Sequence, residues 1–218
     1  MRLQSDDVRA AGGARVHSFA MHRVLTPVDY RRTAWKNGGG RTTELAVHPE
    51  GADFVHFTWR VSIADVTKDG PFSTFDDVDR TLVLLRGAGV RLSSGDAALE
   101  IRVPFEPVTF SGDVPYECAL YDGPVQDFNL MVRRSVARAG VDVVREQAGA
   151  MRPARFRLCY AALGACECLL PGNVPLRLNE RESLFVDAAG EAPSVLHVNP
   201  LTPDAVALVV VVDLVGAA

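Results

Sequence analysis

Hydrophobic and polar residues alternate with a period of two along most of the chain, and Gly, Pro, Asn or Asp interrupts the alternation every eight to twelve residues. This pattern is typical of an all-β sandwich or barrel, because successive side chains of a strand point to opposite faces. Amphipathic helical patterns are scarce. The alternation predicts thirteen short strands, at residues 42–47, 54–63, 79–86, 89–92, 108–110, 117–121, 128–133, 157–163, 166–170, 176–178, 183–186, 195–199 and 206–214.

The number of strands favours two lobes over one minimal barrel. A faint internal repeat agrees, because residues 90–101 (VRLSSGDAALEI) and 176–187 (LRLNERESLFVD) share a strand, a polar turn and a second strand. We therefore expect residues 21–140 to form an N-terminal lobe with a pocket and residues 141–218 a C-terminal lobe, joined through a connector at 136–155. Periodic sequence begins only near Met21, so residues 1–20 are predicted to be a flexible extension, with Met21 a candidate for the true start.

Composition and charge exclude several classes of protein. The 218 residues are 48% hydrophobic and 23% charged, which is ordinary for a soluble globular protein. A net charge of −4 gives no basic footprint for nucleic acid. The longest apolar run, residues 205–212, is too short to cross a membrane, and the first twenty residues lack the apolar core of a secretory signal. We expect a cytoplasmic protein with no nucleic-acid or membrane partner.

The cysteines and histidines show no metal-binding pattern. Cys118, Cys159, Cys166 and Cys168 match no zinc spacing, and alternation places Cys166 and Cys168 on one face of a strand, where small buried residues are common. The five histidines include no His-x-His. The sequence therefore predicts no metal and no cofactor, with the cysteines reduced and buried.

Polar side chains interrupt several segments that otherwise have the pattern of core strands. In TWRVSIADV, Trp59, Val61 and Ile63 take one face, and Arg60 and Ser62 take the other. If the first face is core, the second faces water or lines the inside of a barrel. The same alternation singles out Glu44, Asp127 and Asn129, and Arg80 opens the apolar strand TLVLL directly after the acidic turn DDVD.

Together these groups would form a pocket for a small polar or zwitterionic ligand. Arginine binds a carboxylate through two parallel hydrogen bonds, while Glu and Asp accept hydrogen bonds from an ammonium, amide or imidazole N–H. The alternative is that Arg60 and Arg80 pair with Asp127 and Glu44 as structural salt bridges. The residue pattern leaves both interpretations open.

Two loop motifs also have alternative interpretations. In WKNGGGRTTE (35–44), the glycines after Asn37 either turn a hairpin or form a run of N–H groups that cradles an anion. The motif lacks the spacing of a phosphate-binding loop, so it does not predict a nucleotide. KDGPFSTF (68–75) predicts a tight turn with Phe72 or Phe75 against the core, or else a rim over the pocket.

The motifs WKNGGGRTTELA, FTWRVSIADVTKDGPFSTFDDVDRTLVLLRGAGVRL and YDGPVQDFNLMVRR, in this order, resemble the HutD/Ves family of cupin-like proteins. The resemblance covers residues 23–212 and implies a metal-free bicupin, two small antiparallel β-barrels of the jelly-roll type packed into one unit. It also implies a role in bacterial histidine utilisation as a modulator that binds a metabolite, rather than as an established enzyme. The ligand-binding candidates that it carries over are Trp35, Lys36, Asn37, Glu44, Arg60, Ser62, Arg80, Asp127 and Asn129.

Three functions follow as hypotheses. The first is a metal-independent sensor that binds a carboxylate-bearing metabolite such as urocanate, histidine or a formylglutamate-like compound. The second is a cupin-type isomerase, lyase or hydrolase with Glu44 or Asp127 as general acid or base. The third is an interaction module for an enzyme or regulator of the pathway. A homodimer is compatible with each of them.

Overall fold

A computed structural model describes residues 21–145, 152–170, 174–189 and 196–216, so the predicted extension at 1–20 lies outside the described residues. Every regular element in the described ranges is a β-strand, and the strands pair antiparallel. The predicted all-β class is confirmed. No helix in these ranges is long and apolar enough to span a membrane.

The N-terminal lobe consists of two facing sheets. Its strands are β2 (Arg31–Ala34), β3 (Gly40–His48), β4 (Trp59–Val66), β5 (Gly70–Phe72), β6 (Val78–Arg86), β7 (Val90–Ser94), β8 (Ala97–Ile101), β9 (Pro107–Ser111), β10 (Tyr116–Leu120) and β11 (Val125–Arg133). One sheet has the order β2-β3-β4-β11-β6-β9 and the other β5-β10-β7-β8. The six-stranded sheet carries most of the residues that the sequence predicts to form a pocket.

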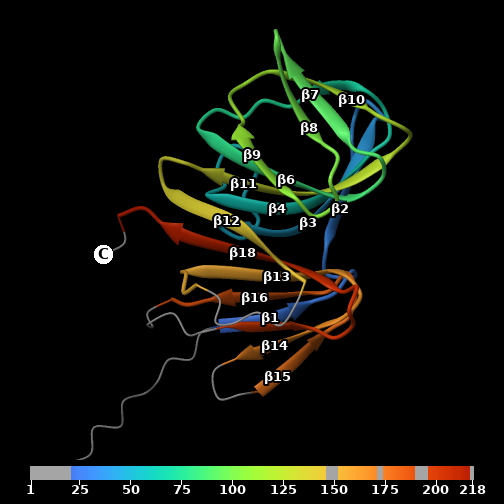
Figure 1. Cartoon of the computed structure of the whole chain (residues 1–218). Coiled ribbons are helices and arrows are strands. Elements are labelled where there is room, and N and C mark those ends of the chain that lie inside the picture. Colours follow the sequence, from blue (N-terminus) through green and yellow to red (C-terminus); the bar gives the residue numbers. More distant parts are fainter. Residues whose placement is uncertain (1–20, 146–151, 171–173, 190–195, 217–218) are drawn as a thin grey trace, which may run out of the picture.

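The C-terminal lobe repeats this arrangement with fewer strands. It contains β1 (Met21–Leu25), β12 (Ala137–Val144), β13 (Phe156–Leu163), β14 (Cys166–Leu170), β15 (Val174–Leu178), β16 (Ser183–Asp187), β17 (His197–Pro200) and β18 (Val206–Leu214). The sheets have the orders β1-β16-β13-β18-β12 and β15-β14-β17. Figure 1 shows the two lobes one above the other, with β12 and β18 next to the N-terminal lobe.

Two strands show how the chain passes between the lobes. β1 pairs with β16 of the C-terminal lobe before the chain enters the N-terminal lobe at β2. β12 pairs with β18, so the predicted boundary at residue 140 falls within a strand. The described part of the predicted connector at 136–155 is largely this strand. Arg138, Gly140 and Asp142 alternate there with Ala139, Val141 and Val143, which pack against the apolar cluster between the lobes, so the segment has the period of two that marks a strand.

The largest apolar cluster lies between the six-stranded and five-stranded sheets. It includes Trp59, Val61 and Ile63 from β4 and Phe156 and Leu208 from the C-terminal lobe. The prediction that Trp59, Val61 and Ile63 face a core is therefore confirmed. Because strand side chains alternate, the opposite face of β4 turns into the interior of the N-terminal lobe.

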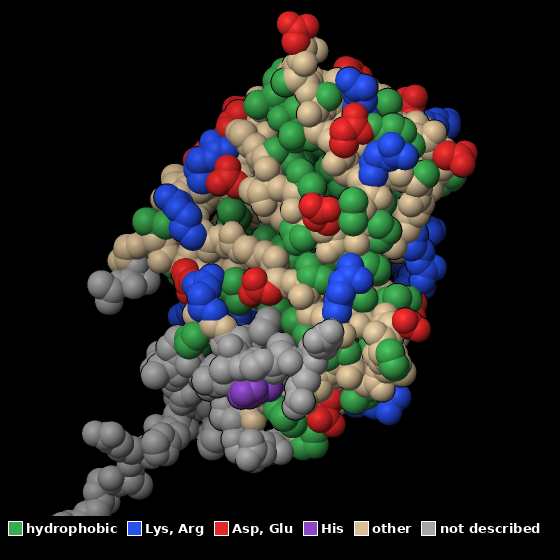
Figure 2. All heavy atoms as spheres, in the orientation of Figure 1, with side chains coloured by type: hydrophobic (Ala, Val, Ile, Leu, Met, Phe, Trp, Pro, Cys, Tyr) green, Lys and Arg blue, Asp and Glu red, His purple; other side chains and the backbone are tan. Residues whose placement is uncertain are grey.

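Charged side chains occupy much of the surface that Figure 2 displays. Lys and Arg side chains are interspersed there with Asp and Glu rather than gathered into one basic patch. This face therefore has none of the concentrated positive charge that a phosphate backbone requires.

Candidate functional site

The interior face of the six-stranded sheet carries a row of buried polar side chains. Arg60 and Ser62 come from β4, Arg80 from β6, and Asp127 and Asn129 from β11, and each residue is 7% exposed or less. Alternation correctly predicted that Arg60 and Ser62 share one face, and that Asp127 and Asn129 share one face. The sheet order β4-β11-β6 then brings these residues together with Arg80. Of the two predicted environments for this face of β4, water or the inside of a barrel, the structure shows the lobe interior.

Strand register places the two arginines at the same level of the sheet. Met131 of β11 pairs with Arg60 on one side and with Arg80 on the other. Asn129, two residues earlier, pairs with Ser62. The two guanidinium groups therefore flank one central strand, which is a suitable arrangement for enclosing a small anion.

Glu44 joins this group through an irregularity in β3. The register shifts between Glu44 and Ala46, so Leu45 enters the apolar cluster between the lobes while Glu44 lies opposite Ser62. Glu44 Oε2 lies 2.5 Å from Arg60 Nη2, and Glu44 Oε1 lies 3.4 Å from the exposed Arg31. The predicted alternative of an ion pair is thus realised at Arg60, although with Glu44 alone.

Aromatic rings cover both guanidinium groups. The Arg60 guanidinium lies 4.1 Å from the ring centre of Phe54, and that of Arg80 lies 4.1 Å from the ring centre of Phe72 and 5.6 Å from that of Phe75. Such stacking favours a cation and leaves its edge free to donate hydrogen bonds. The KDGPFSTF motif therefore forms a turn and a short strand, and it also supplies aromatic cover for Arg80.

Asp127 and Arg80 form a buried pair of opposite charge without direct ion-pair contact in the described structure. Burial raises the pKa of Asp127 to about 7, while Arg80 lowers that pKa and Asp65 raises it. Burial likewise lowers the pKa of Arg80 to about 10, and Asp127 opposes this shift. Asp127 can therefore exchange a proton near neutral pH while Arg80 remains a cation.

Several polar atoms in this interior have no hydrogen-bond partner within the described residues. They are Arg60 Nη1, Arg80 Nε and Asn129 Oδ1. Arg80 Nη1 does donate to the Ser73 carbonyl, at 3.1 Å. Buried polar groups are nearly always satisfied, so these unpaired donors and this acceptor make the lobe interior the candidate for a polar binding site.

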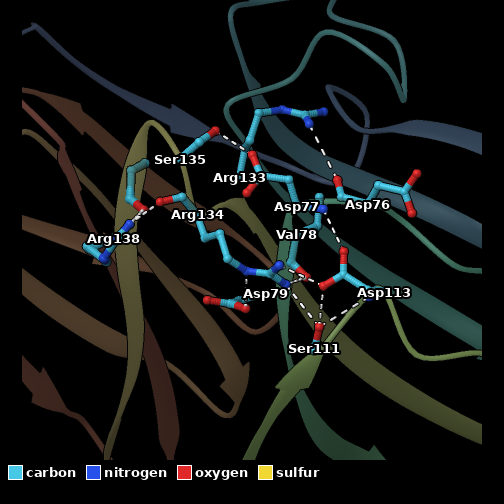
Figure 3. A network of polar contacts seen from close by, with 11 residues as sticks. Asp76, Asp77, Val78, Asp79, Ser111, Asp113, Arg133, Arg134, Ser135 and Arg138 are labelled. Carbon is cyan, nitrogen blue, oxygen red and sulfur yellow. Dashed lines mark hydrogen bonds and ion pairs between the residues drawn. The ribbon is translucent and has the colours of Figure 1, made fainter.

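The arginines at the end of β11 hold the surrounding loops. Arg133 donates from Nη2 to the Val55 carbonyl at 2.8 Å and from Nε to the Phe57 carbonyl at 3.2 Å, which fixes the segment that carries Phe54. Arg134 bridges Asp79 and Asp113, as Figure 3 shows. Arg133 thus holds the segment at residues 55–57, and Arg134, directly after β11, holds β6 and the turn between β9 and β10.

The WKNGGG motif lies away from the two arginines. The indole Nε1 of Trp35 donates to Thr42 Oγ1 at 2.8 Å, and its ring packs against the apolar part of the lobe interior. Asn37 Oδ1 accepts from the Gly39 N–H at 2.9 Å, so it stabilises the turn, and Lys36 is exposed. Here the hairpin interpretation describes the geometry.

This hairpin also borders an open surface cavity of about 620 Å³. Gly38, Gly40 and Arg41 line one part of it, and Arg86 and Gln126 another. Arg41 and Gln126 both donate to the carboxylate of Asp65, and Arg86 pairs with Glu180. Its polar groups are thus already paired, unlike those of the lobe interior.

Gly40 is the glycine of this motif whose replacement we expect to be most damaging. A Cβ atom at this position would lie 2.2 Å from the Asp65 carbonyl oxygen and 3.1 Å from the Trp35 ring. Gly40→Ala should lower the free energy of unfolding by roughly 2 kcal/mol or more, measured by urea denaturation. Gly140→Ala is the matched control, because a Cβ there meets nothing within 4 Å. Equal effects of the two substitutions would contradict this close approach.

The histidine and carboxylate metal site of metal-binding cupins has no counterpart in the described residues of this lobe. Among the described residues, the group of three or more closely spaced His, Cys, Asp or Glu ligand atoms consists of cysteines in the other lobe. His56 lies in the segment 54–63 that the sequence predicts as one strand, but it is exposed in a turn, where it contacts Asp53 at 2.7 Å.

The paired two-sheet lobes define the class as a two-lobed cupin-like protein. A cupin 2 conserved barrel domain protein from Leptotrichia buccalis shares the fold, with a TM-score of 0.53 at 10% identity over 84% of this chain and 96% of that protein.

The chain belongs to the HutD family, which matches residues 27–199. It is 32% identical over 169 residues to a Pseudomonas putida protein described as an uncharacterized 21.2 kDa protein in the hutC 3′ region, covering 78% of this chain and 88% of that protein. Protein Ves of Cronobacter sakazakii is 39% identical, covering 60% of this chain and 71% of that protein. The solved structure of HutD from Pseudomonas fluorescens SBW25 (formate condition) is also similar. Its TM-score is 0.76 at 30% identity, and the match covers 90% of this chain and 100% of that protein. Membership links the chain to the histidine utilisation locus.

Proposed function

We propose that this protein binds a small carboxylate-bearing metabolite of histidine utilisation inside its N-terminal lobe, without a metal, and so modulates the pathway in the cytoplasm. The candidates are urocanate, histidine and a formylglutamate-like compound. Family membership supports the pathway, and the buried polar groups support the ligand chemistry.

The observation that carries the proposal is the pair of guanidinium groups beside Met131. Arg60 and Arg80 are almost fully buried, each lies over an aromatic ring, and each keeps one nitrogen without a partner in the described residues. Burying a cation is costly unless an anion and hydrogen bonds compensate it. Glu44 already supplies an anion to Arg60, whereas Arg80 makes no ion-pair contact within the described residues. A ligand carboxylate would supply the anion for Arg80 and accept from the unpaired nitrogens of both arginines.

The remaining polar groups suit the rest of such a ligand. Asn129 Oδ1 is a free acceptor, and Glu44 is a carboxylate at the edge of the same group. An imidazole or amide N–H, or an ammonium group, could donate to either of them. The rings of Phe54 and Phe72 give flat apolar surface against which a planar compound such as urocanate would pack.

An enzyme is the second candidate, and Asp127 favours it. Its pKa of about 7 lies where a general acid or base works best, and it is buried beside Arg80. In this case the bound metabolite would be converted, and the Asp127→Asn variant would bind it without conversion.

Calorimetric titration of metal-free protein with urocanate, histidine and N-formylglutamate tests the proposal. We expect one of them to bind and to be recovered intact, as mass spectrometry would show. A converted ligand would establish the enzyme instead, and the absence of binding for all three would contradict a carboxylate site for this pathway.

Arg60→Met is the variant that locates the site. Methionine keeps much of the side-chain length but removes the donors, so we expect affinity to fall about 100-fold or more. Arg41→Met is the matched control, because Arg41 is exposed and pairs with Asp65 outside this interior. Equal affinity of the two variants would place the ligand elsewhere.

A further inference from the structure

Three cysteines meet inside the C-terminal lobe, although their sequence spacing gives no metal pattern. Cys166 and Cys168 lie on one face of β14, as alternation predicts, and Cys159 comes from β13 in the other sheet of the lobe. Their sulfur atoms all lie within 4.8 Å of one another. The sequence could not indicate this arrangement, because it depends on how the two sheets face each other.

We propose that Cys159, Cys166 and Cys168 form a three-sulfur site for a soft, thiophilic metal ion of the Cu(I) type. Metal–sulfur bonds of about 2.3 Å, the value for zinc thiolates, would place three sulfurs around a central ion roughly 4 Å apart. The observed upper limit of 4.8 Å between the sulfur atoms is compatible with this geometry. The proposal is independent of the ligand proposed for the N-terminal lobe.

Three cysteine sulfur atoms favour a soft metal ion. Thiolate ligands favour soft ions such as Cu(I) and disfavour Mg²⁺ and Ca²⁺, which prefer oxygen. Among the described residues, no His, Asp or Glu joins the three sulfur atoms in this group. Structural zinc sites almost always have four protein ligands, whereas Cu(I) readily accepts three sulfurs.

The surroundings are consistent with a closed site. The three cysteines are no more than 1% exposed and lie in an apolar cluster with Leu178, Leu184 and Val198. Apolar walls exclude water and other ligands from a bound ion.

The test is titration of the full chain with Cu(I), under anaerobic conditions with a non-thiol reductant and a chromophoric Cu(I) chelator as competitor. We expect one Cu(I) per chain, a first shell of three sulfurs by X-ray absorption, and a higher melting temperature for the loaded protein. No retention of Cu(I) against the competitor would overturn the proposal and leave the cysteines as packing residues.

Single substitutions assign the ligands. Cys159→Ala and Cys166→Ala should each weaken Cu(I) binding by about 100-fold or more, and Cys168→Ala serves the same purpose if either variant does not fold. Cys118→Ala is the matched control, since Cys118 is buried in the N-terminal lobe and should leave binding unchanged. Binding that survives these changes, or is lost equally with Cys118→Ala, would overturn the assignment.

Discussion

We expect the wild type to lose stability as pH rises from about 4 to 8, and the Asp127→Asn variant to lack this loss. The pKa of Asp127 is about 7 in the folded protein, against an ordinary value of 3.8. A folded pKa above the unfolded value means that the unfolded chain releases this proton first, so the contribution to stability is complete below pH 4 and is lost as pH passes through 7. The shift corresponds to roughly 4 kcal/mol at most.

Urea unfolding at several pH values between 4 and 8 measures this effect. We expect the wild type to become less stable than Asp127→Asn above pH 7, with the two similar near pH 4. Asp113→Asn is the contrasting control, because hydrogen bonds from Ser111 and Arg134 lower the pKa of Asp113 to about 2. Its contribution is present above pH 4 and is lost as pH falls toward 2. Parallel pH profiles for the wild type and Asp127→Asn would show that Asp127 titrates normally.

Arg80→Met should have the second large effect, on both ligand affinity and the titration of Asp127. Removing the guanidinium takes away a free donor in the proposed site, and we expect carboxylate affinity to fall by roughly 100- to 1000-fold. It also removes the positive charge that lowers the pKa of Asp127, so that pKa should rise above 7. Calorimetry and carbon NMR of the Asp127 carboxyl group measure the two effects.

Two comparisons separate these effects from general damage to the fold. Arg86 is exposed on β6, the strand that carries Arg80, and pairs with Glu180. Arg86→Met should therefore change neither the carboxylate affinity nor the pKa of Asp127. Arg60→Met should weaken the ligand but leave Asp127 unaffected, because Arg60 pairs with Glu44. If Arg80→Met left the Asp127 titration unchanged, the proposed electrostatic coupling would be wrong.

Local alternation predicted the faces of the site strands because period-two patterning needs only neighbouring residues. The positions of Arg60 and Ser62, and of Asp127 and Asn129, follow from it directly. Glu44 could be chosen for its charge, but its approach to Arg60 depends on the irregular register after it. A one-residue shift of this kind has no clear signal in a single sequence.

The other parts of the site depend on contacts between distant segments. Phe54 reaches Arg60 from a loop that the sequence predicted as part of a strand, and Phe72 reaches Arg80 from another sheet. Asn37 has the amide that a pocket would use, yet it completes its own turn. Short polar side chains next to glycine often do this, because the local hydrogen bond needs no tertiary partner.

A crystal structure of the protein with the tightest binding of urocanate, histidine and N-formylglutamate tests the central claim most directly. We expect the ligand carboxylate within hydrogen-bond distance of both Arg60 and Arg80, with the rest of the ligand against the Phe54 and Phe72 rings. A ligand bound instead in the open cavity beside Gly38 and Arg41, or an interior filled only by ordered water at saturating ligand, would contradict the claim.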